Sequence, residues 1–376
     1  MRLESRSWPD LKDGERGVLR EVLVHGSRSR VELARRLGLS RASLSRLTRP
    51  LLGHGLVYEG ETLPPTGRGR PSEILHIAPG AAHFVGVKLT GTHMYLVVTD
   101  LSARIVHAEE RALEQRSVEA VVDLISSAVA GAEASYPIAA VGVCLAGDVE
   151  TVDGRELVVH SDFLGWEHVS LLTLVESATG HRAAVDNDVQ SLTMAHHWFG
   201  AGVGLSSFAL LVFGEGIGGG IVVNGELLRG AHGRPGKLDH LPTSDTGPLC
   251  DRGHVGCLSA YATTSAVSRN AGQGDAGYSE ALRRARSGDE LSLRAFRDAG
   301  TAVGAAVASV SNLLDPEKVI LTGEGLAIFD LAADEFADGV RARVNPLAKT
   351  PIVDVQKFSF QDYAWAAAIG AIRRVV

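Results

Sequence analysis

The sequence is poor in several features, and each shortage narrows the class of protein. Three cysteines in 376 residues are too few for the disulfide framework of a small secreted domain. No apolar run reaches the length of a membrane span, and the first residues lack the pattern of a secretory signal peptide. We therefore expect a soluble protein of the cytoplasm.

What the chain does contain is a large apolar fraction and an uneven charge. With 45% hydrophobic residues over 376 positions, it can bury large cores and form two or three domains. Residues 1–78 carry 14 basic and 9 acidic side chains, a net charge of +5. The remaining 23 basic and 35 acidic side chains give the rest of the chain −12, for −7 in total. This division predicts a basic head that binds a polyanion and an acidic body that does not.

The head shows the order of elements found in helix-turn-helix domains. Apolar spacing predicts helices over residues 13–25, 31–37 and 41–54. Ser29 and Ser40 are suitable N-caps for the second and third helices, and Gly38 supplies a tight turn between them. The third helix is expected to bury the stripe Leu44, Leu47 and Leu51. We therefore predict a helix-turn-helix whose third helix is the recognition helix.

The other face of this third helix carries polar side chains suited to DNA. They are Arg41, Ser43, Ser45, Arg46 and Arg49. Arg and Ser on the N-terminal half of a recognition helix can hydrogen-bond to base edges and phosphates in the major groove. The alternative is an ordinary solvated face on a three-helix bundle.

A glycine-rich segment follows and favours the DNA interpretation. Leu56 and Val57 begin one predicted strand, and residues 74–77 end another. Between them lies Gly67-Arg68-Gly69-Arg70-Pro71, the composition of a hairpin tip. Arg68 and Arg70 in such a wing can enter a narrow minor groove. A flexible linker would have a similar composition, so this remains the alternative. We predict that residues 1–78 form a winged helix-turn-helix domain that binds duplex DNA.

The body alternates predicted strands and helices. Strands are expected at residues 84–87, 95–99, 138–144, 208–213 and 318–321, and helices at 117–133, 189–199, 290–314 and 363–373. Strands in sets with intervening helices predict an α/β fold in two lobes, with a ligand in the crevice between them. Asp186-Asn187-Asp188 comes directly after a short apolar run, where a carboxylate can bind a sugar hydroxyl and take its proton.

Six segments of the body, in order, resemble motifs of the ROK family of repressors, open reading frames and kinases. They are Val85–His93, Asp186–Asp188, Gly214–Gly220, Gly236–His240, Cys250–Cys257 and Leu321–Gly325. The resemblance covers residues 81–376 and implies the two-lobed actin-like, hexokinase-like ATPase fold, here acting as an effector and oligomerisation domain. Family repressors also carry a head like residues 1–78. The resemblance thus implies either a regulator or a sugar kinase.

Two departures from the family pattern argue against kinase activity. Family kinases have an Asp in the first phosphate loop, where this chain has Lys88, and a Thr in the second, where it has Glu215. A Lys cannot ligate Mg²⁺, and a carboxylate beside polyphosphate is repelled by it. Phosphoryl transfer depends on positioning and charge neutralisation, so we expect no catalysis and no ATP or Mg²⁺ as cofactor. We also consider a Lys88–Glu215 ion pair across the empty nucleotide site.

The sugar side of the resemblance is also altered. Two positions at which the family has sugar-binding glutamates are Lys237 and Ser259 here, and the Gly before the family's zinc-linked histidine is Asp239. Asn187, Asp188 and His240 are kept. The effector-binding candidates are therefore Asn187, Asp188, Lys237, His240 and Gly147. A cation in place of a carboxylate suggests an acidic or phosphorylated effector, or a site without ligand. Alternatively, Lys237 points to solvent.

The resemblance also implies a zinc site, in an altered form. The family uses one His and three Cys, but Arg252 stands where the middle Cys would be. His240, Cys250, His254 and Cys257 can still supply the four ligands of a structural zinc. The alternative is that zinc is lost and Arg252 bonds into the loop. Cys144 is expected to be a buried core residue.

These observations predict a DNA-binding transcriptional regulator, a repressor of carbohydrate-related genes with a kinase-derived sensor body. Its expected partners are a double-stranded DNA operator, a sugar or sugar derivative, and further copies of itself. Two-fold operators require paired heads, so we expect a homodimer or homotetramer. The first alternative is an ATP-dependent sugar kinase with an accessory DNA-binding head, in which Asp188 is the base. The second is a ligand-independent DNA-binding protein controlled by a protein partner.

Overall fold

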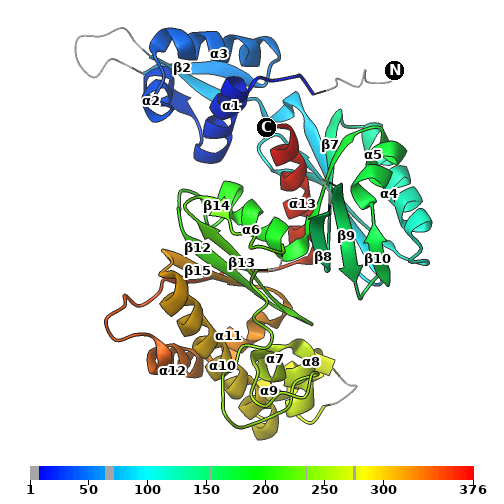
Figure 1. Cartoon of the computed structure of the whole chain (residues 1–376), viewed down its shortest axis with the longest axis vertical. Helices are drawn as coiled ribbons and strands as arrows, with labels where there is room; N and C mark the ends of the chain where they lie inside the picture. The colour runs from blue at the N-terminus through cyan, green and yellow to red at the C-terminus, as the bar shows by residue number, and fades with distance from the viewer. Residues whose placement is uncertain (1–7, 64–71, 153–154, 234, 274–276) are drawn as a thin grey trace. The chain divides into compact units, whose positions relative to one another are not determined.

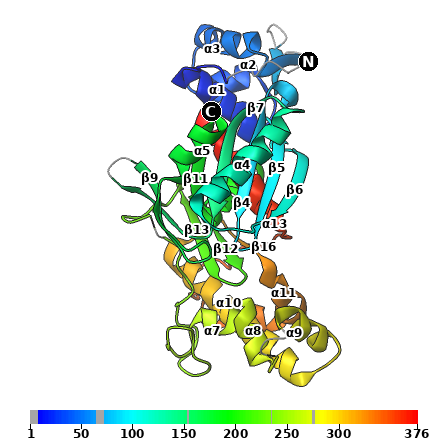
Figure 2. The ribbon, with the colours of Figure 1, turned by 90° about the vertical axis from the view of Figure 1, so that its right-hand side faces the viewer.

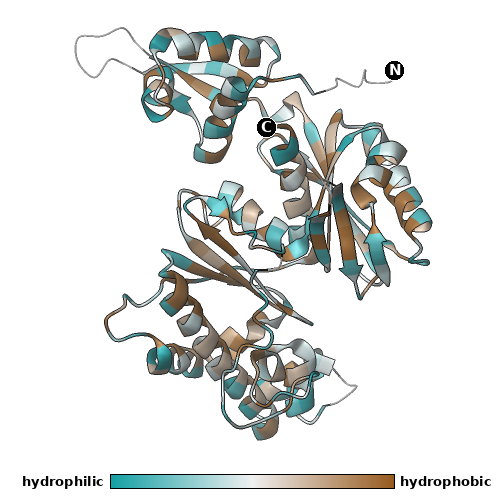
Figure 3. Cartoon of the chain, in the orientation of Figure 1, coloured by the Kyte–Doolittle hydropathy of each residue, from teal (hydrophilic) through white to brown (hydrophobic). Residues whose placement is uncertain are grey.

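The computed structural model describes residues 8–63, 72–152, 155–233, 235–273 and 277–376. Its chain forms two compact units (Figures 1 and 2). The first contains residues up to Gly204 together with Phe360–Val376, and the second contains Leu205–Ser359. Hydrophobic residues concentrate in the strands of the large sheets (Figure 3). No helix among the described residues has the length and apolar character needed to cross a membrane.

The head begins the first unit and has the predicted elements. Its helices are α1 (Asp13–His25), α2 (Arg30–Arg36) and α3 (Arg41–Gly53), and its strands β1 (Arg28–Ser29), β2 (Val57–Leu63) and β3 (Ser72–Ile77) form a sheet in the order β1-β3-β2. Ser29 caps α2 by accepting from the Glu32 backbone N–H, and Ser40 caps α3 by accepting from that of Ser43. Both predicted caps are thus confirmed.

The core of the head differs from the prediction at one position. Leu44 and Leu51 are buried as predicted, but Leu47 is only half-buried. Thr48 is fully buried instead, because its hydroxyl accepts a hydrogen bond from Arg30 and so has a polar partner inside the head. β2 and β3 pair in antiparallel fashion up to Leu63 and Ser72. The predicted wing tip, with Arg68 and Arg70, lies outside the described residues.

After η1 (Pro79–Ala81), the first unit continues as an α/β lobe. Its five-stranded sheet has the order β11-β7-β4-β5-β6. The strands are β4 (His83–Leu89), β5 (His93–Asp100), β6 (Ile105–Ala112), β7 (Ile138–Leu145) and β11 (Arg182–Asn187). β4, β7 and β11 are parallel, whereas β5 and β6 are antiparallel. A small sheet holds β8 (Asp148–Val152), β9 (Arg155–Ser161) and β10 (Trp166–Val169).

Helices cover both faces of this sheet. One face packs in a core with α4 (Val118–Glu133) and α5 (Leu171–Thr179), while α13 (Phe360–Val375) and α6 (Asp188–Phe199) lie together on the other. Gly86 and Gly142 allow α13 to approach closely, because an added Cβ would lie 1.9 Å from the Ala364 carbonyl oxygen and 1.8 Å from that of Ala367. The last helix of the chain is thereby pressed against the two central parallel strands.

The second unit is built on another five-stranded sheet, in the order β14-β13-β12-β15-β16. Its strands are β12 (Phe208–Phe213), β13 (Ile217–Val223), β14 (Glu226–Leu227), β15 (Lys318–Thr322) and β16 (Val353–Val355). Its helices are α7 (Leu258–Ala262), α8 (Thr264–Asn270), α9 (Gly277–Arg286), α10 (Glu290–Leu314), η3 (Glu324–Leu326), α11 (Ala327–Leu331) and α12 (Ala333–Arg343). The predicted α/β architecture in two lobes is confirmed, and the predicted helix over residues 290–314 has the same bounds as α10.

Candidate functional site

Asp188, the candidate base, is part of a buried ion pair. It is the first residue of α6, and its carboxylate accepts a hydrogen bond from the Lys88 ammonium of β4. Only 3% of Lys88 and 6% of Asp188 is exposed. The Lys88 Nζ atom also lies 4.4 Å from the centroid of the Tyr363 ring, a cation–π contact. The carboxylate is therefore neutralised within the first unit.

The sheet explains how residues 100 positions apart meet. Side chains of a strand alternate between its two faces, so Lys88 lies on the same face as Gly86, the face that α13 covers. In the register of the parallel strands, Lys88 is level with Cys144 of β7, and Cys144 is level with Asp186 of β11. β11 ends one residue before Asp188, which brings its carboxylate to the same end of the sheet as Lys88.

Asn187 has a structural role in holding α6. Its side-chain oxygen accepts hydrogen bonds from the backbone N–H groups of Val189 and Gln190, at 2.9 and 3.2 Å, which makes it the N-cap. Its amide nitrogen donates to the Gly147 carbonyl at 2.9 Å. Two of the predicted effector-binding residues, Asn187 and Gly147, are thus joined directly to each other.

Lys88 and Glu215, which we considered as a possible ion pair, each have another partner. Lys88 pairs with Asp188 in the first unit, and Glu215 bonds to Thr264 in the second. Glu215 lies in the turn between β12 and β13 and accepts a hydrogen bond from the Thr264 hydroxyl at 2.9 Å. The Thr264 backbone N–H donates to the Gly214 carbonyl at 2.9 Å. The glycine-rich turn is therefore fastened to the start of α8 and holds a carboxylate at the family's second phosphate loop.

The remaining effector candidates, Lys237 and His240, lie in the second unit. Lys237 is exposed and follows Gly236, whose φ of +80° and close approach to the Gly219 carbonyl leave no room for a side chain. Ser259, at a family sugar-binding position, has a buried hydroxyl without a hydrogen-bond partner among the described residues. His240 lies 3.3 Å from the Asp239 carboxylate through Nε2.

The four predicted metal ligands come together. One ligand atom from each of His240, Cys250, His254 and Cys257 lies within 4.8 Å of the other three. The Sγ of Cys250 is 3.5 Å from the Nδ1 of His240. Ligand atoms around a tetrahedral zinc are about 3.3–3.8 Å apart, given Zn–S and Zn–N bonds of about 2.3 and 2.0 Å. The donor set therefore suits one four-coordinate zinc ion, and ligand atoms up to 4.8 Å apart would move together by about 1 Å to bind it.

The loop around this cluster is preformed. Gly256 has φ +70°, and an added Cβ would lie 1.9 Å from the Ser244 carbonyl oxygen. Burial alone would raise the pKa of Cys250, but the backbone N–H groups of His254 and Arg252 donate to its sulfur and hold the pKa below the ordinary value. The Arg252 side chain is 72% exposed and lies 4.0 Å from its neighbour Asp251. Among the described residues this exposed neighbour is the ion-pair partner of Arg252, so the Arg252 side chain does not replace the missing cysteine inside the cluster.

Cys144 is the core residue that was predicted. It is fully buried, and its thiol donates to the Tyr363 carbonyl at 3.2 Å. Burial raises its pKa well above the ordinary range, so the thiol stays protonated.

In the head, one group of arginines forms ion pairs with carboxylates of the head itself. Arg28 pairs with Glu32 at 2.8 Å, Arg36 with Glu21, and Arg30 with Glu59 and Glu73. Arg30 also donates to the Thr48 hydroxyl of α3 at 2.9 Å. These contacts join α2 to α1, α3 and the strands, and so fix the orientation of the third helix.

A second group of arginines has no carboxylate partner. Arg41, Arg46 and Arg49 of α3 are exposed and form no ion pair with any residue that the structure describes. Ser45 is exposed beside them, whereas Ser43 is half-buried, 3.0 Å from the Ser40 hydroxyl. Arg20 and Arg35 also lack a carboxylate partner within the described part of the chain. The predicted DNA face thus presents unneutralised positive charge.

Three side chains that contact the candidate sites were not predicted. Tyr363 faces Lys88, Thr264 holds Glu215, and Phe199 ends α6 beside the head. Strand register would have pointed to the Lys88–Asp188 pair, because Lys88 lies near the end of β4, Asp188 directly follows β11, and these two parallel strands flank β7. No local sequence signal marks Tyr363 or Phe199.

Comparisons with known proteins agree with this architecture. The model of the ROK family matches residues 84–374. The N-acetylglucosamine repressor of Escherichia coli O157:H7 is 26% identical over 324 residues, which is 82% of this chain and 79% of that protein. A crystal structure of a ROK family transcriptional regulator, described as a homologue of the E. coli MLC protein, covers 96% of this chain and 95% of its own. Its TM-score is 0.81 at 22% identity, and this likeness establishes the fold.

A kinase of the same fold matches less of the chain. The ROK family glucokinase from Streptomyces griseus, solved with glucose and AMPPNP, is 27% identical with a TM-score of 0.66. The match covers all of the kinase but 78% of this chain. Because the family model matches 84–374, well over half of the sequence, and the fold is that of a ROK regulator along nearly its whole length, the chain belongs to the ROK family.

Proposed function

We propose that this protein is a transcriptional regulator, a repressor of carbohydrate-related genes, whose head binds duplex DNA and whose kinase-derived body senses a small molecule. The observation that carries the proposal is the face of α3, where Arg41, Arg46 and Arg49 are exposed and lack carboxylate partners among the described residues. Positive charge without internal compensation binds phosphates and releases their counterions. The naming of an E. coli relative as a repressor supports the same role.

The proposal includes the loss of phosphotransfer. Lys88 stands where family kinases have an Asp that helps to bind the metal and phosphates. Here it holds Asp188 in a buried ion pair. A base must be within reach of the substrate hydroxyl and able to accept its proton, and an Asp188 paired with an ammonium is a weaker acceptor. Glu215, fastened by Thr264, places negative charge where polyphosphate would bind. The body therefore binds without catalysing.

The effector we propose is a sugar or a sugar derivative with an acidic group. On the second unit, the exposed Lys237 supplies a cation, and the buried Ser259 hydroxyl lacks a partner among the described residues. On the first, Asn187, Asp188 and Gly147 line the end of β11, where family members bind sugar hydroxyls. A ligand that favours one arrangement of the lobes shifts the heads' affinity for DNA by its differential binding. Paired heads on a two-fold operator require a homodimer or homotetramer.

We also propose that His240, Cys250, His254 and Cys257 hold one structural zinc ion. Zinc would link the two ends of the Cys250–Cys257 loop to each other and to His240. Its four protein ligands would leave no open coordination position for catalysis. Because Lys237 precedes His240 by three residues, the ion would also fix the segment that carries the proposed effector-binding cation.

Zinc content tests this site directly. Purified protein is expected to contain about one zinc ion per chain, and Cys257→Ser is expected to lower that value to near zero, since a structural site loses its metal when a thiolate is removed. Inductively coupled plasma mass spectrometry gives the stoichiometry. Cys144→Ser is the matched control, because Cys144 lies in the other unit and should leave zinc unchanged. Wild-type protein purified without chelators and free of zinc would contradict the assignment.

The regulator proposal is tested by selection from a random duplex library with the full chain. We expect a recurrent two-fold sequence whose affinity falls steeply as salt rises. The same preparation should show no turnover of ATP with a panel of hexoses and N-acetylhexosamines. Failure to enrich any sequence would contradict DNA recognition. Phosphorylation of a sugar that Asp188→Asn abolishes would instead establish the kinase alternative.

A further inference from the structure

Helix α6 connects the candidate ligand site to the head. Its first residue, Asp188, forms the ion pair with Lys88, and its last residue, Phe199, lies beside the DNA-binding head. Twelve residues of α-helix are about 18 Å long at 1.5 Å per residue. One rigid helix thus begins at the proposed sensor residues and ends beside the DNA-binding head.

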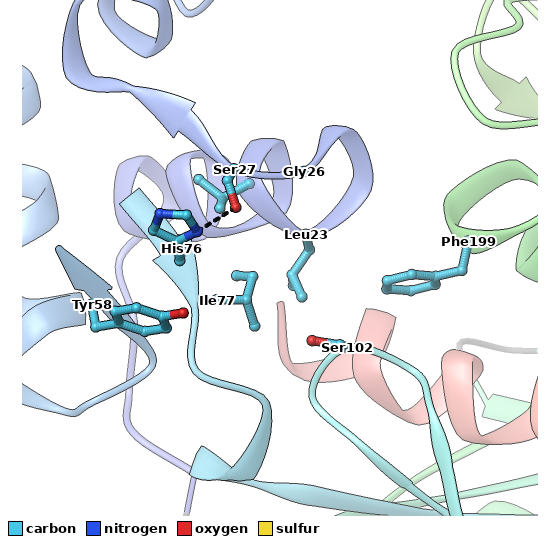
Figure 4. A pocket seen from close by; sticks show the side chains of 9 residues that line it. Leu23, Gly26, Ser27, Tyr58, His76, Ile77, Ser102 and Phe199 are labelled. Atoms are coloured by element: carbon cyan, nitrogen blue, oxygen red, sulfur yellow. Dashed lines mark hydrogen bonds between the residues drawn. The ribbon is translucent and has the colours of Figure 1, made fainter. Parts of the chain in front are cut away.

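The head meets α6 across a cavity of about 270 Å³ (Figure 4). Leu23 of α1 and Ile77 of β3 line it from the head, and Phe199 and Ser102 line it from the lobe. Figure 4 shows the Phe199 ring pointing toward Leu23. Such a cavity leaves room for the ring and the end of α1 to shift, which a close-packed core would not permit.

The body of α6 is held too firmly to absorb a displacement. Leu192, Met194 and Ala195 are buried, and the Trp198 ring lies 5.6 Å from the Arg373 guanidinium of α13. The His196 and Trp365 rings meet edge to face at 6.3 Å. A packed helix of this kind moves as a unit, because bending it would break hydrogen bonds or open voids.

Two further contacts among the described residues join the head and its connection to the lobe. The Trp8 ring meets Phe84 at 5.7 Å, and the Leu101 backbone N–H donates to the Pro79 carbonyl at 3.0 Å. The connection from β3 to β4 is only the short segment 78–82, which contains η1. A displacement of Phe199 therefore acts on a head whose covalent connection to the lobe is short.

We infer that α6 transmits the state of the Lys88–Asp188 site to the DNA-binding head, with Phe199 as the positioning residue that lines the cavity shared with the head. The inference rests on the proposed function, since it assigns the element through which the sensor regulates DNA binding. A ligand that hydrogen-bonds to the side chain of Asp188 or of Asn187, the N-cap, displaces the N-terminus of α6. The helix transfers that displacement to the Phe199 ring and thence to Leu23 of α1.

A double-mutant cycle on the full chain tests the relay. Asp188→Asn removes the charge at one end of α6, and we expect it to change affinity for the selected DNA by at least about fivefold, within the usual range of coupling between sites. Combined with Phe199→Ala, the same change should have less than about a twofold effect. Phe199→Leu keeps apolar bulk and should preserve most of the response. Phe163→Ala, a half-exposed phenylalanine elsewhere on the lobe, should preserve all of it.

Hydrogen exchange provides a readout that needs no DNA. Asp188→Asn should alter amide exchange in residues 17–25 of α1, and Phe199→Ala should remove that response. Equal effects of Asp188→Asn with and without Phe199→Ala, by either readout, would overturn the relay, as would no effect in either background. If the wild type enriches no DNA sequence, the regulator proposal fails, whereas the exchange measurement still decides whether α6 couples the site to the head.

Discussion

Replacing Lys88 by methionine is expected to destabilise the first unit by about 3–5 kcal/mol, the usual cost of leaving a buried charge without its partner. Asp188 is 6% exposed, and Lys88 is the ion-pair partner that the structure gives it. Methionine keeps most of the side-chain volume, so little of the loss would come from a cavity. Because the chain has two units, the measurement is the urea midpoint of the transition that first-unit tryptophan fluorescence reports.

Two further variants separate charge from packing. Lys349→Met removes an exposed lysine and should change stability by no more than about 0.5 kcal/mol. Lys88→Met combined with Asp188→Leu removes both charges, and should recover much of the loss, since an apolar pair of similar volume can replace a buried ion pair. A Lys88→Met protein as stable as the wild type would show that Asp188 is not held by this pair.

The same pair shows where prediction from the sequence ends. Helix α10 was predicted with its observed bounds because its apolar period is a local signal, and the structure adds Asp289 as its N-cap. The partner of Lys88 was not, because a lysine one hundred residues from an aspartate carries no local sign of contact. From the sequence we considered Glu215 as the partner of Lys88, whereas the structure pairs Lys88 with Asp188. The register of β4, β7 and β11, which brings Lys88 and Asp188 to the same end of the sheet, becomes visible only in the folded chain.

The grouping of the four proposed zinc ligands could be predicted for the opposite reason. The family resemblance pointed to His240, Cys250 and Cys257, and His254 was added because it lies between the two cysteines and can supply a fourth ligand. Phe199 and Leu23 offered neither short spacing nor distinctive chemistry. The role we infer for them depends on where α6 and α1 end, and an apolar residue at a helix end is common in any sequence. Residues whose chemical type suggests a role can thus be picked out from the sequence. Residues whose role depends on their place in the fold cannot.

The largest effect on DNA binding is expected from the three exposed arginines of α3. Replacing Arg41, Arg46 and Arg49 together by alanine should weaken binding to the selected DNA by at least about 100-fold, since each good contact with a base or phosphate contributes about 1–3 kcal/mol. Each lost phosphate contact should also reduce the slope of log affinity against log salt by about 0.9, so the slope should fall by up to about 2.7. Fluorescence anisotropy between 50 and 200 mM salt measures both quantities.

The controls use arginines of the same charge in other settings. Arg294→Ala removes a 77% exposed side chain from α10 and should leave both affinity and salt slope unchanged. Arg36→Ala removes a head arginine that Glu21 already neutralises, so it should affect stability by about 1 kcal/mol or less and leave the slope within error. If Arg36→Ala lowered the slope as much as each α3 substitution, net charge of the head would explain binding. A fall confined to the α3 variants would instead identify the unpaired arginines as the surface that meets the phosphates.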